Sequence, residues 1–176
     1  EFRFEKRRKK SVFLRNEIPK KLVSFFQEKE FFTVLFTPED IFLPFAAPQD
    51  RRRFLSRLLF PLDTELFEMA RRAEQILKRR NALLRLISEE KATEEELDFF
   101  DETFAEASNF ITQARQDFFQ KFSETFSEKY QLISGTEEEC CLSFFPNCKE
   151  DLLSLLKKNR RRDILLGATQ HGAHRD

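Results

Sequence analysis

The chain has 176 residues, of which 40% are hydrophobic and 35% charged, with 31 Lys and Arg against 31 Asp and Glu. It contains only 3 Gly and 6 Pro, so the composition excludes a linker and a disordered tail. Its longest nearly continuous apolar run, Ile41 to Pro48, is far shorter than the ~20 residues that span a bilayer. We therefore expect a soluble, cytoplasmic protein that buries one core, or a core plus a projecting arm.

The balanced total hides a strong segregation of charge along the chain. Residues 49–88 hold ten Lys and Arg against five Asp and Glu, residues 89–139 hold four against fifteen, and residues 149–162 hold six against two. Such segregation carries information about partners and association, not about the fold.

The first 47 residues predict strands and one short helix. The segments EFRFEKRR and SVFLRNE alternate enough for a hairpin, with Lys9 and Lys10 near its turn. The segment KKLVSFFQEKE predicts a short helix, and FFTVLF predicts a buried strand that Thr37 and Pro38 end.

Helical periodicity begins at Pro48, which suits the first turn of a helix. That helix has one apolar stripe and ends at Pro61. From Asp63 to Ile87, apolar residues then recur at heptad spacing, which predicts a long helix of roughly 35–40 Å. Its seam consists of Leu62, Leu66, Met69, Ala73, Ile76, Arg80, Leu83 and Ile87, and only Arg80 interrupts the apolar set.

A second long helix follows after a short turn. Thr93 and Glu96 have the spacing of a capping box, and Gly135 suits a left-handed helix end. Because one helix is basic and the other acidic, and because the turn is short, we expect an antiparallel helical hairpin. The second seam consists of Leu97, Phe100, Phe104, Ala107, Ile111, Ala114 and Phe118.

The last 40 residues predict a strand, a helix and a returning strand. The segment ECCLSFF predicts the first strand, Asn147 with Glu150 the start of a helix through LLSLLKKNRRR, and DILLGAT the second strand. The predicted fold class is therefore α+β, mainly α, with an antiparallel, coiled-coil-like hairpin between short strand segments.

The sequence contains no recognisable catalytic or metal-binding motif. Gly167 and Gly172 have the spacing of P-loop glycines, but Ala173 and His174 follow where Lys and Ser or Thr are needed. We expect no metal site, although a small zinc-dependent nucleic-acid binder stays an alternative, since Cys and His residues occur without zinc-finger spacing. These residues are Cys140, Cys141, Cys148, His171 and His174, and alternation on a strand would bury one of Cys140 and Cys141.

Clusters of basic residues are the strongest candidates for a binding surface. They are Arg51 to Arg53, Arg71 and Arg72, Lys78 to Arg80, and Arg160 to Arg162. They suit contact with phosphates, and nothing in the sequence suggests reading of bases. The alternative is that they form solvated faces or pair with the acidic helix.

Several segments, taken in order, resemble the RecF family of ATPases, which are related to SMC proteins. The matching segments are TPEDI from Thr37, Pro48 followed by RRRFL, RRNALL from Arg79, Ser134-Gly135, and GATQHGAHRD from Gly167. The chain departs from the family pattern at Ser56, Ala73, Arg79 and Ala173.

The resemblance implies that this chain is an internal piece of a longer protein. The residues at the two ends of the chain lead to the same expectation. It implies a split ABC-type ATPase head with residues 1–47 at its edge, an inserted helical arm over residues 48–136, and a return to the head over residues 137–176. The sites for ATP and Mg²⁺ would lie outside this chain, which lacks the P-loop, signature and Walker B motifs. The family dimerises when it binds ATP, binds DNA, and loads recombinase together with RecO and RecR. The resemblance implies no membrane partner.

The resemblance and the charges together give two sets of candidate residues. The candidates for DNA binding are Arg51, Arg52, Arg53, Arg57, Arg79 and Arg80. The candidates at the junction of head and arm are Glu39, Asp40, His174, Arg175 and Asp176. The alternative function is a stand-alone helical-hairpin adaptor that binds protein through its Phe-rich seam and has no ATPase.

Overall fold

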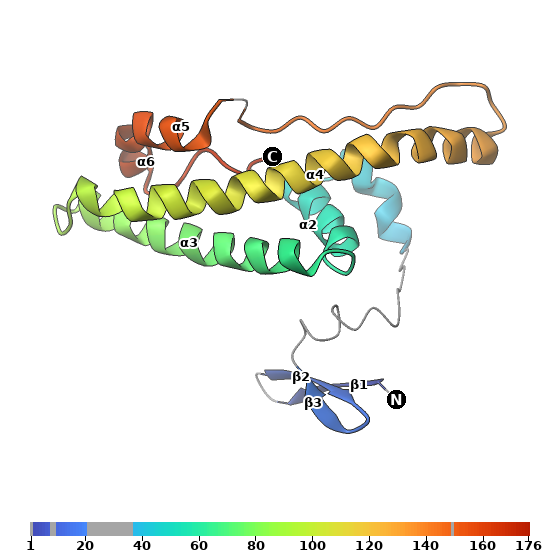
Figure 1. Ribbon diagram of the computed structural model, residues 1–176, viewed down its shortest axis with the longest axis horizontal. Helices are drawn as coiled ribbons and strands as arrows, with labels where there is room; N and C mark the ends of the chain where they lie inside the picture. The colour runs from blue at the N-terminus through green and yellow to red at the C-terminus, as the bar shows by residue number, and fades with distance from the viewer. Residues whose placement is uncertain (1, 8–9, 21–36, 149) are drawn as a thin grey trace. The chain divides into compact units, whose positions relative to one another are not determined.

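The computed structural model describes residues 2–7, 10–20, 37–148 and 150–176 (Figure 1). The chain divides into two compact units, residues 1–67 and residues 68–176. The predicted strand FFTVLF and nearly all of the predicted helix KKLVSFFQEKE lie outside the described residues.

The first unit begins with a small antiparallel sheet of three strands in the order β1-β2-β3. Strand β1 (Phe2–Arg7) pairs with β2 (Lys10–Arg15), which confirms the predicted hairpin. Strand β3 (Ile18–Lys20) was not predicted. It follows Asn16 and Glu17, whose φ angles of 49° and 65° give the left-handed pair that a two-residue hairpin turn requires.

Two helical elements complete the first unit. The 3₁₀ helix η1 (Pro38–Phe45) starts after Thr37, whose backbone N–H donates to Asp40 Oδ2 at 2.8 Å. Helix α2 (Pro48–Leu59) starts at Pro48, as predicted, because proline lacks only an N–H that has no partner in a first helical turn.

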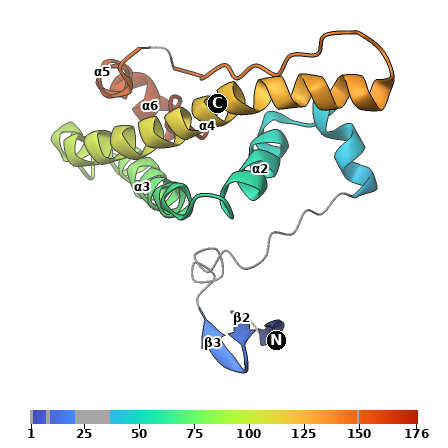
Figure 2. The same ribbon diagram turned by 45° about the vertical axis from the view of Figure 1, so that its right-hand side comes forward.

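The long helices α3 (Thr64–Ser88) and α4 (Leu97–Ser134) lie side by side and antiparallel (Figures 1 and 2). Near the turn, Leu83 and Leu84 of α3 pack with Leu97 of α4. The turn contains the 3₁₀ helix η2 (Glu94–Glu96) and the predicted capping box. Helix α4 ends at Gly135, whose φ of 66° confirms the predicted left-handed end.

The part of the chain after α4 differs from its prediction. Residues 140–145 form no strand, and helix α5 (Leu152–Lys158) starts with Asp151 as its N-cap, so the predicted start at Asn147 and Glu150 is wrong. Helix α6 (Arg160–Leu166) takes most of the predicted strand DILLGAT. The short apolar run was compatible with either element, and the helix is favoured because Gly167 supplies a left-handed end at φ 59°.

The core of the second unit forms where α5 packs on the hairpin (Figures 1 and 2). Phe104 and Ala105 of α4 bury themselves against Leu152 and Leu156 of α5. The chain is thus mainly helical, as predicted, while the predicted strand-helix-strand return is wrong for the described residues 137–148 and 150–176. Within the described residues, no helix has the length and apolar character that crossing a membrane requires.

Candidate functional site

Arg80 lies at the centre of a buried polar cluster that joins α3, α4, α6 and the loop after α6. Its side chain is 0% exposed. Nε donates to Asp101 Oδ1 at 2.7 Å, and Nη1 donates to Asp163 Oδ2 at 2.8 Å and to Thr169 Oγ1 at 2.7 Å. The prediction that Arg80 contacts DNA is therefore wrong, because its guanidinium is enclosed and bound to two carboxylates. We call Arg80, Asn81, Asp101, Arg160, Asp163 and Thr169 the Arg80 cluster.

A second guanidinium, that of Arg160, shares Asp101 with Arg80. Arg160 Nε and Nη2 donate to Asp101 Oδ2 at 2.8 and 2.6 Å, and Nη2 also donates to Asp98. The bond and the charge of Arg160 hold the pKa of Asp98 below its ordinary value. Burial lowers the pKa of Arg160, but the bonds to Asp98 and Asp101 outweigh burial and raise it overall. Both guanidinium groups of the cluster are therefore bound to carboxylates.

The loop after α6 is fastened to α3 through Thr169. The backbone N–H and the hydroxyl of Thr169 both donate to Asn81 Oδ1, at 2.9 and 2.7 Å. Asp163 Oδ1 accepts from the Gln170 N–H at 3.2 Å. Burial raises the pKa of Asp163, and the hydrogen bond and charge of Arg80 oppose that rise. Asn81 thus fastens the loop to α3 of the hairpin, and Asp163 fastens it to α6.

The end of the same loop lies against α4. Gly172 has a φ of 124°, and an added Cβ there would come within 2.8 Å of the Phe104 ring. Arg115 Nη1 donates to the Ala173 carbonyl at 2.7 Å and to Asp176 Oδ2 at 3.2 Å. The His174 ring meets Phe104 edge-on, with 5.7 Å between ring centroids. Only glycine fits at position 172, since its backbone is left-handed and touches an aromatic ring.

His174, Arg175 and Asp176, which were predicted to lie at a junction, thus belong to this docked loop. His174 Nε2 donates to the Thr169 carbonyl at 3.1 Å, and Arg175 Nη2 donates to the same oxygen at 3.4 Å. Asp176 Oδ2 accepts from Thr112 Oγ1 at 2.8 Å. Asp176 and His174 thus hold the loop on α4, and Arg175 bonds within the loop, while a junction with an ATPase head stays a prediction.

The predicted DNA-binding arginines of α2 lie mostly at the surface. Arg51, Arg53 and Arg57 are exposed, and Arg52 is half-buried. Arg53 pairs with Asp50 at 3.1 Å, and Arg57 pairs with Asp40 at 3.6 Å. Arg79 of α3 is exposed as well. These side chains are accessible to a ligand, although Arg53 and Arg57 already have carboxylate partners.

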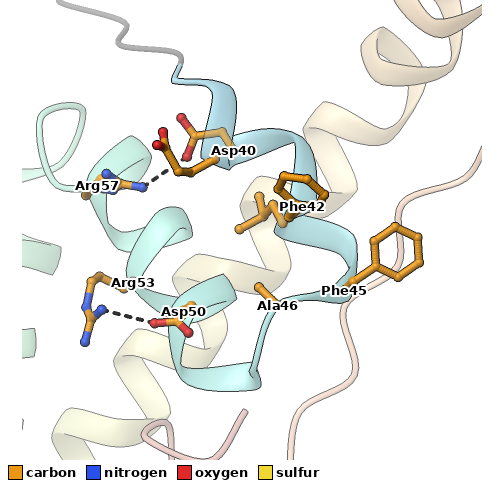
Figure 3. Close-up of a pocket in the computed structure, with 9 residues that line it drawn as sticks. Asp40, Phe42, Phe45, Ala46, Asp50, Arg53 and Arg57 are labelled. Carbon is orange, nitrogen blue, oxygen red and sulfur yellow. Dashed lines mark hydrogen bonds and ion pairs between the residues drawn. The ribbon is translucent and has the colours of Figure 1, made fainter.

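An open recess of about 430 Å³ lies between η1 and α2 (Figure 3). Glu39 and Asp40 line it from η1, and Arg53 and Arg57 from α2. The Thr37 backbone N–H, which donates to Asp40, holds the pKa of that carboxyl below its ordinary value. At the rim Phe45 is 88% exposed. The recess therefore mixes ion pairs with exposed aromatic rings, and nothing in it resembles a catalytic set.

The zinc alternative gains no support from the described part of the chain. There, no three Cys, His, Asp or Glu side chains gather closely enough to hold a metal ion. Cys140 is half-buried and Cys141 is exposed, so the prediction that alternation buries one of them is wrong. The predicted strand is absent at these residues, which removes the alternation on which that prediction depended.

Comparison with known proteins decides the family. No protein-family model matches the chain. DNA replication and repair protein RecF of Bacteroides thetaiotaomicron is 33% identical over 174 residues, which cover 97% of this chain and 46% of that protein. The RecF of Ruminiclostridium cellulolyticum is 30% identical over 174 residues, which cover 92% of this chain and 46% of that protein.

Solved structures of RecF match the fold of this chain, in agreement with the sequence comparison. A structure of the recombination mediator protein RecF-ATPrS in the RecFOR pathway superposes with a TM-score of 0.85 at 28% identity, over 99% of this chain and 49% of that chain. The chain is homologous to part of RecF. A structure of RecF-ATP also matches, with a TM-score of 0.77 over 94% of this RecF segment. The segment spans about half the length of the RecF proteins that it matches.

Sequence reasoning missed most of the Arg80 cluster. One signal was present in this RecF segment, since Arg80 was the only charged residue in an apolar seam, and a buried charge requires a partner. Asp101 and Arg160 were read as parts of solvated or phosphate-binding faces, and Asp163 as part of a strand. Treating Arg80 as buried would have directed attention to the acidic residues of α4.

Proposed function

We propose that this RecF segment is the DNA- and partner-positioning arm of an ATPase that acts in DNA replication and recombinational repair in the cytoplasm. The observation that carries the proposal is the match to RecF, which extends over nearly the whole chain in both sequence and fold. The matched structures are those of a recombination mediator with ATP or ATPrS. A stand-alone adaptor would not account for a match of this extent.

The proposed mechanism is positioning, not chemistry within this chain. The 176 residues contain no P-loop sequence, so ATP and Mg²⁺ would be held by residues outside them. ATP would supply the energy of dimerisation, which would bring two arms together around DNA. RecO and RecR would then act with the dimer in loading recombinase.

The Arg80 cluster suits such a role because it makes the hairpin and the loop over residues 167–176 one rigid body. Arg80 bonds to Asp101 on α4, Asp163 on α6 and Thr169 in the loop at 2.7 to 2.8 Å. A displacement of the loop would therefore move the hairpin with it, since breaking these buried, charged hydrogen bonds would leave unpaired charges in the interior.

DNA would be contacted through its phosphates by exposed arginines. Our candidates are Arg51, Arg52, Arg53 and Arg57 on α2 and Arg79 on α3. Contacts of this kind bind DNA without selecting a sequence, and they weaken as salt rises because counterions compete for the phosphates.

The first experiment is to read the coding DNA on both sides of this segment and to express the intact protein. A P-loop before the segment, with signature and Walker B motifs after it, would support the ATPase arm. DNA binding is then measured by fluorescence anisotropy with and without ATP, at several salt concentrations. Absence of these motifs together with absence of DNA binding would overturn the proposal and favour the adaptor.

A variant locates the contacts on α2. Changing Arg51, Arg52 and Arg53 to Ala in the intact protein should weaken DNA binding and make the salt dependence shallower. If the affinity and the salt dependence both stay at wild-type values, the α2 arginines do not contact DNA, whatever the intact protein does.

A further inference from the structure

About half of the described cationic side chains of the second unit pair with a carboxylate. Arg80 and Arg160 are held within the Arg80 cluster. Exposed cations also have acidic partners, as in the pairs Arg72 with Glu106, Lys78 with Glu74, and Lys157 with Glu102. A cation in such a pair contributes less to binding an external anion, because part of its charge is already compensated.

Other exposed cations of this unit form no ion pair among the described residues, and four of these lie on or beside α5 and α6. Arg85, Lys158, Arg161 and Arg162 are all exposed, and none of them forms an ion pair or a side-chain hydrogen bond among the described residues. We call these four residues the α6 patch.

The backbone brings the members of the α6 patch close together around α6. Lys158 is the last residue of α5, and Arg161 and Arg162 lie in the first turn of α6, separated from Lys158 only by Asn159 and Arg160. Arg85 of α3 approaches from the other end, where its Cγ would lie 3.1 Å from a Cβ added at Gly167.

Carboxylates on α6 and α4 near this surface are bound by other cations. Asp163 is the only acidic residue of α6, and its buried side chain points inward to Arg80. On α4, Asp98 is bound by Arg160 and Glu102 by Lys157. These three acidic groups are thus engaged by other cations and form no ion pair with the α6 patch.

We propose that the α6 patch binds the phosphate backbone of DNA, as a contact surface additional to the arginines of α2. This inference rests on the proposed function. Charge complementarity favours DNA, because exposed cations that form no ion pair among the described residues match a continuous row of phosphates. Most protein contacts to DNA from such side chains go to phosphates, so we expect this contact to position DNA and not to select a sequence.

The test uses the intact protein and the double variant Arg161→Gln/Arg162→Gln. Loss of two phosphate contacts should make the slope of log affinity against log salt shallower by about 1.8, at about 0.9 per contact on duplex DNA. Between 50 and 200 mM salt, the ratio of wild-type to variant affinity should accordingly fall about 12-fold.

A matched control removes the same charge elsewhere on the same unit. Lys121 and Lys129 are exposed on α4 and form no ion pair among the described residues, and Lys121 lies roughly 35 Å along the helix from Asp98, the partner of Arg160. The variant Lys121→Gln/Lys129→Gln should keep the wild-type slope. Far-UV circular dichroism checks that both variants remain folded.

A third variant separates DNA from a protein partner. Leu165 lies beside the α6 patch and is 84% exposed, so a protein docked here would cover it. Leu165→Ser should leave DNA affinity unchanged. Three results would overturn the inference: a wild-type slope in the Arg161→Gln/Arg162→Gln protein, an equal change in the lysine control, or dependence of binding on Leu165.

Failure of the proposed function would give a different result from failure of the α6 patch alone. If the wild-type intact protein bound no DNA with or without ATP, the proposed function and the α6 patch would both be overturned. If the wild-type protein bound DNA but was insensitive to the patch, only the patch would be wrong.

Discussion

Replacing Arg80 with Met would remove a buried charge while nearly preserving the volume of the side chain. Three hydrogen bonds of 2.7, 2.8 and 2.7 Å would be lost. Asp101 would keep its two bonds from Arg160. Asp163 Oδ2, in contrast, accepts from no other donor among the described residues and would be left as a buried, uncompensated carboxylate oxygen.

Removal of one partner from a buried ion pair lowers stability by about 3–5 kcal/mol. We therefore expect Arg80→Met to lower the free energy of unfolding by about that amount. Arg79, the exposed neighbour on α3, supplies the control, since Arg79→Met should change it by no more than about 0.5 kcal/mol. The contrast between adjacent arginines isolates burial as the cause.

Urea unfolding followed by far-UV circular dichroism measures the difference, because a change in stability alone moves the midpoint and leaves the slope unchanged. Adding Asp163→Asn to Arg80→Met should cause less further loss than Asp163→Asn causes in the wild type, by about 0.5–3 kcal/mol, since the two groups interact directly. The reasoning is refuted if Arg80→Met moves the midpoint no further than Arg79→Met, or if the two changes are additive.

Three further predictions concern the packing and the charges around this cluster. Gly172→Ala should lower stability by about 1–3 kcal/mol, because its φ is 124° and the added Cβ would strike Phe104; Gly135→Ala, with φ 66° and open space, should cost less. An equal loss at the two glycines would contradict the close approach. Phe104→Ala should lower stability by about 3–5 kcal/mol, since the ring is 1% exposed, and a urea midpoint close to wild type would argue against that burial. Arg160 lowers the pKa of Asp98, so the stability from their contact is present above the ordinary pKa and is lost as the pH falls through the lowered one. Wild type and Asp98→Asn should therefore differ in urea midpoint at pH 6 and converge toward pH 3, and a constant gap would exclude this linkage.

The hairpin and its boundaries follow from local patterns in the amino-acid sequence. Heptad spacing, the capping box at Thr93 and Glu96, and the glycine at 135 act locally, within one helix or one turn, and the structure has them where they were predicted. Pro48 is a signal of the same kind, and α2 starts there. The RecF motifs were also readable from the sequence, because they depend on the order of short segments and not on how those segments pack.

Which charged residues are buried, and with which partners they pair, depends on the tertiary structure. Arg79 and Arg80 are adjacent in the sequence, yet one is exposed and the other is fully buried, because Arg80 occupies the seam. Its partners Asp101 and Asp163 lie 21 and 83 residues away along the chain. Asp163 reaches it only because residues 160–166 form a helix, which the short run Ile164-Leu165-Leu166 could not establish against a strand. A buried charge requires a partner, but which partner it obtains depends on long-range packing that no local pattern encodes.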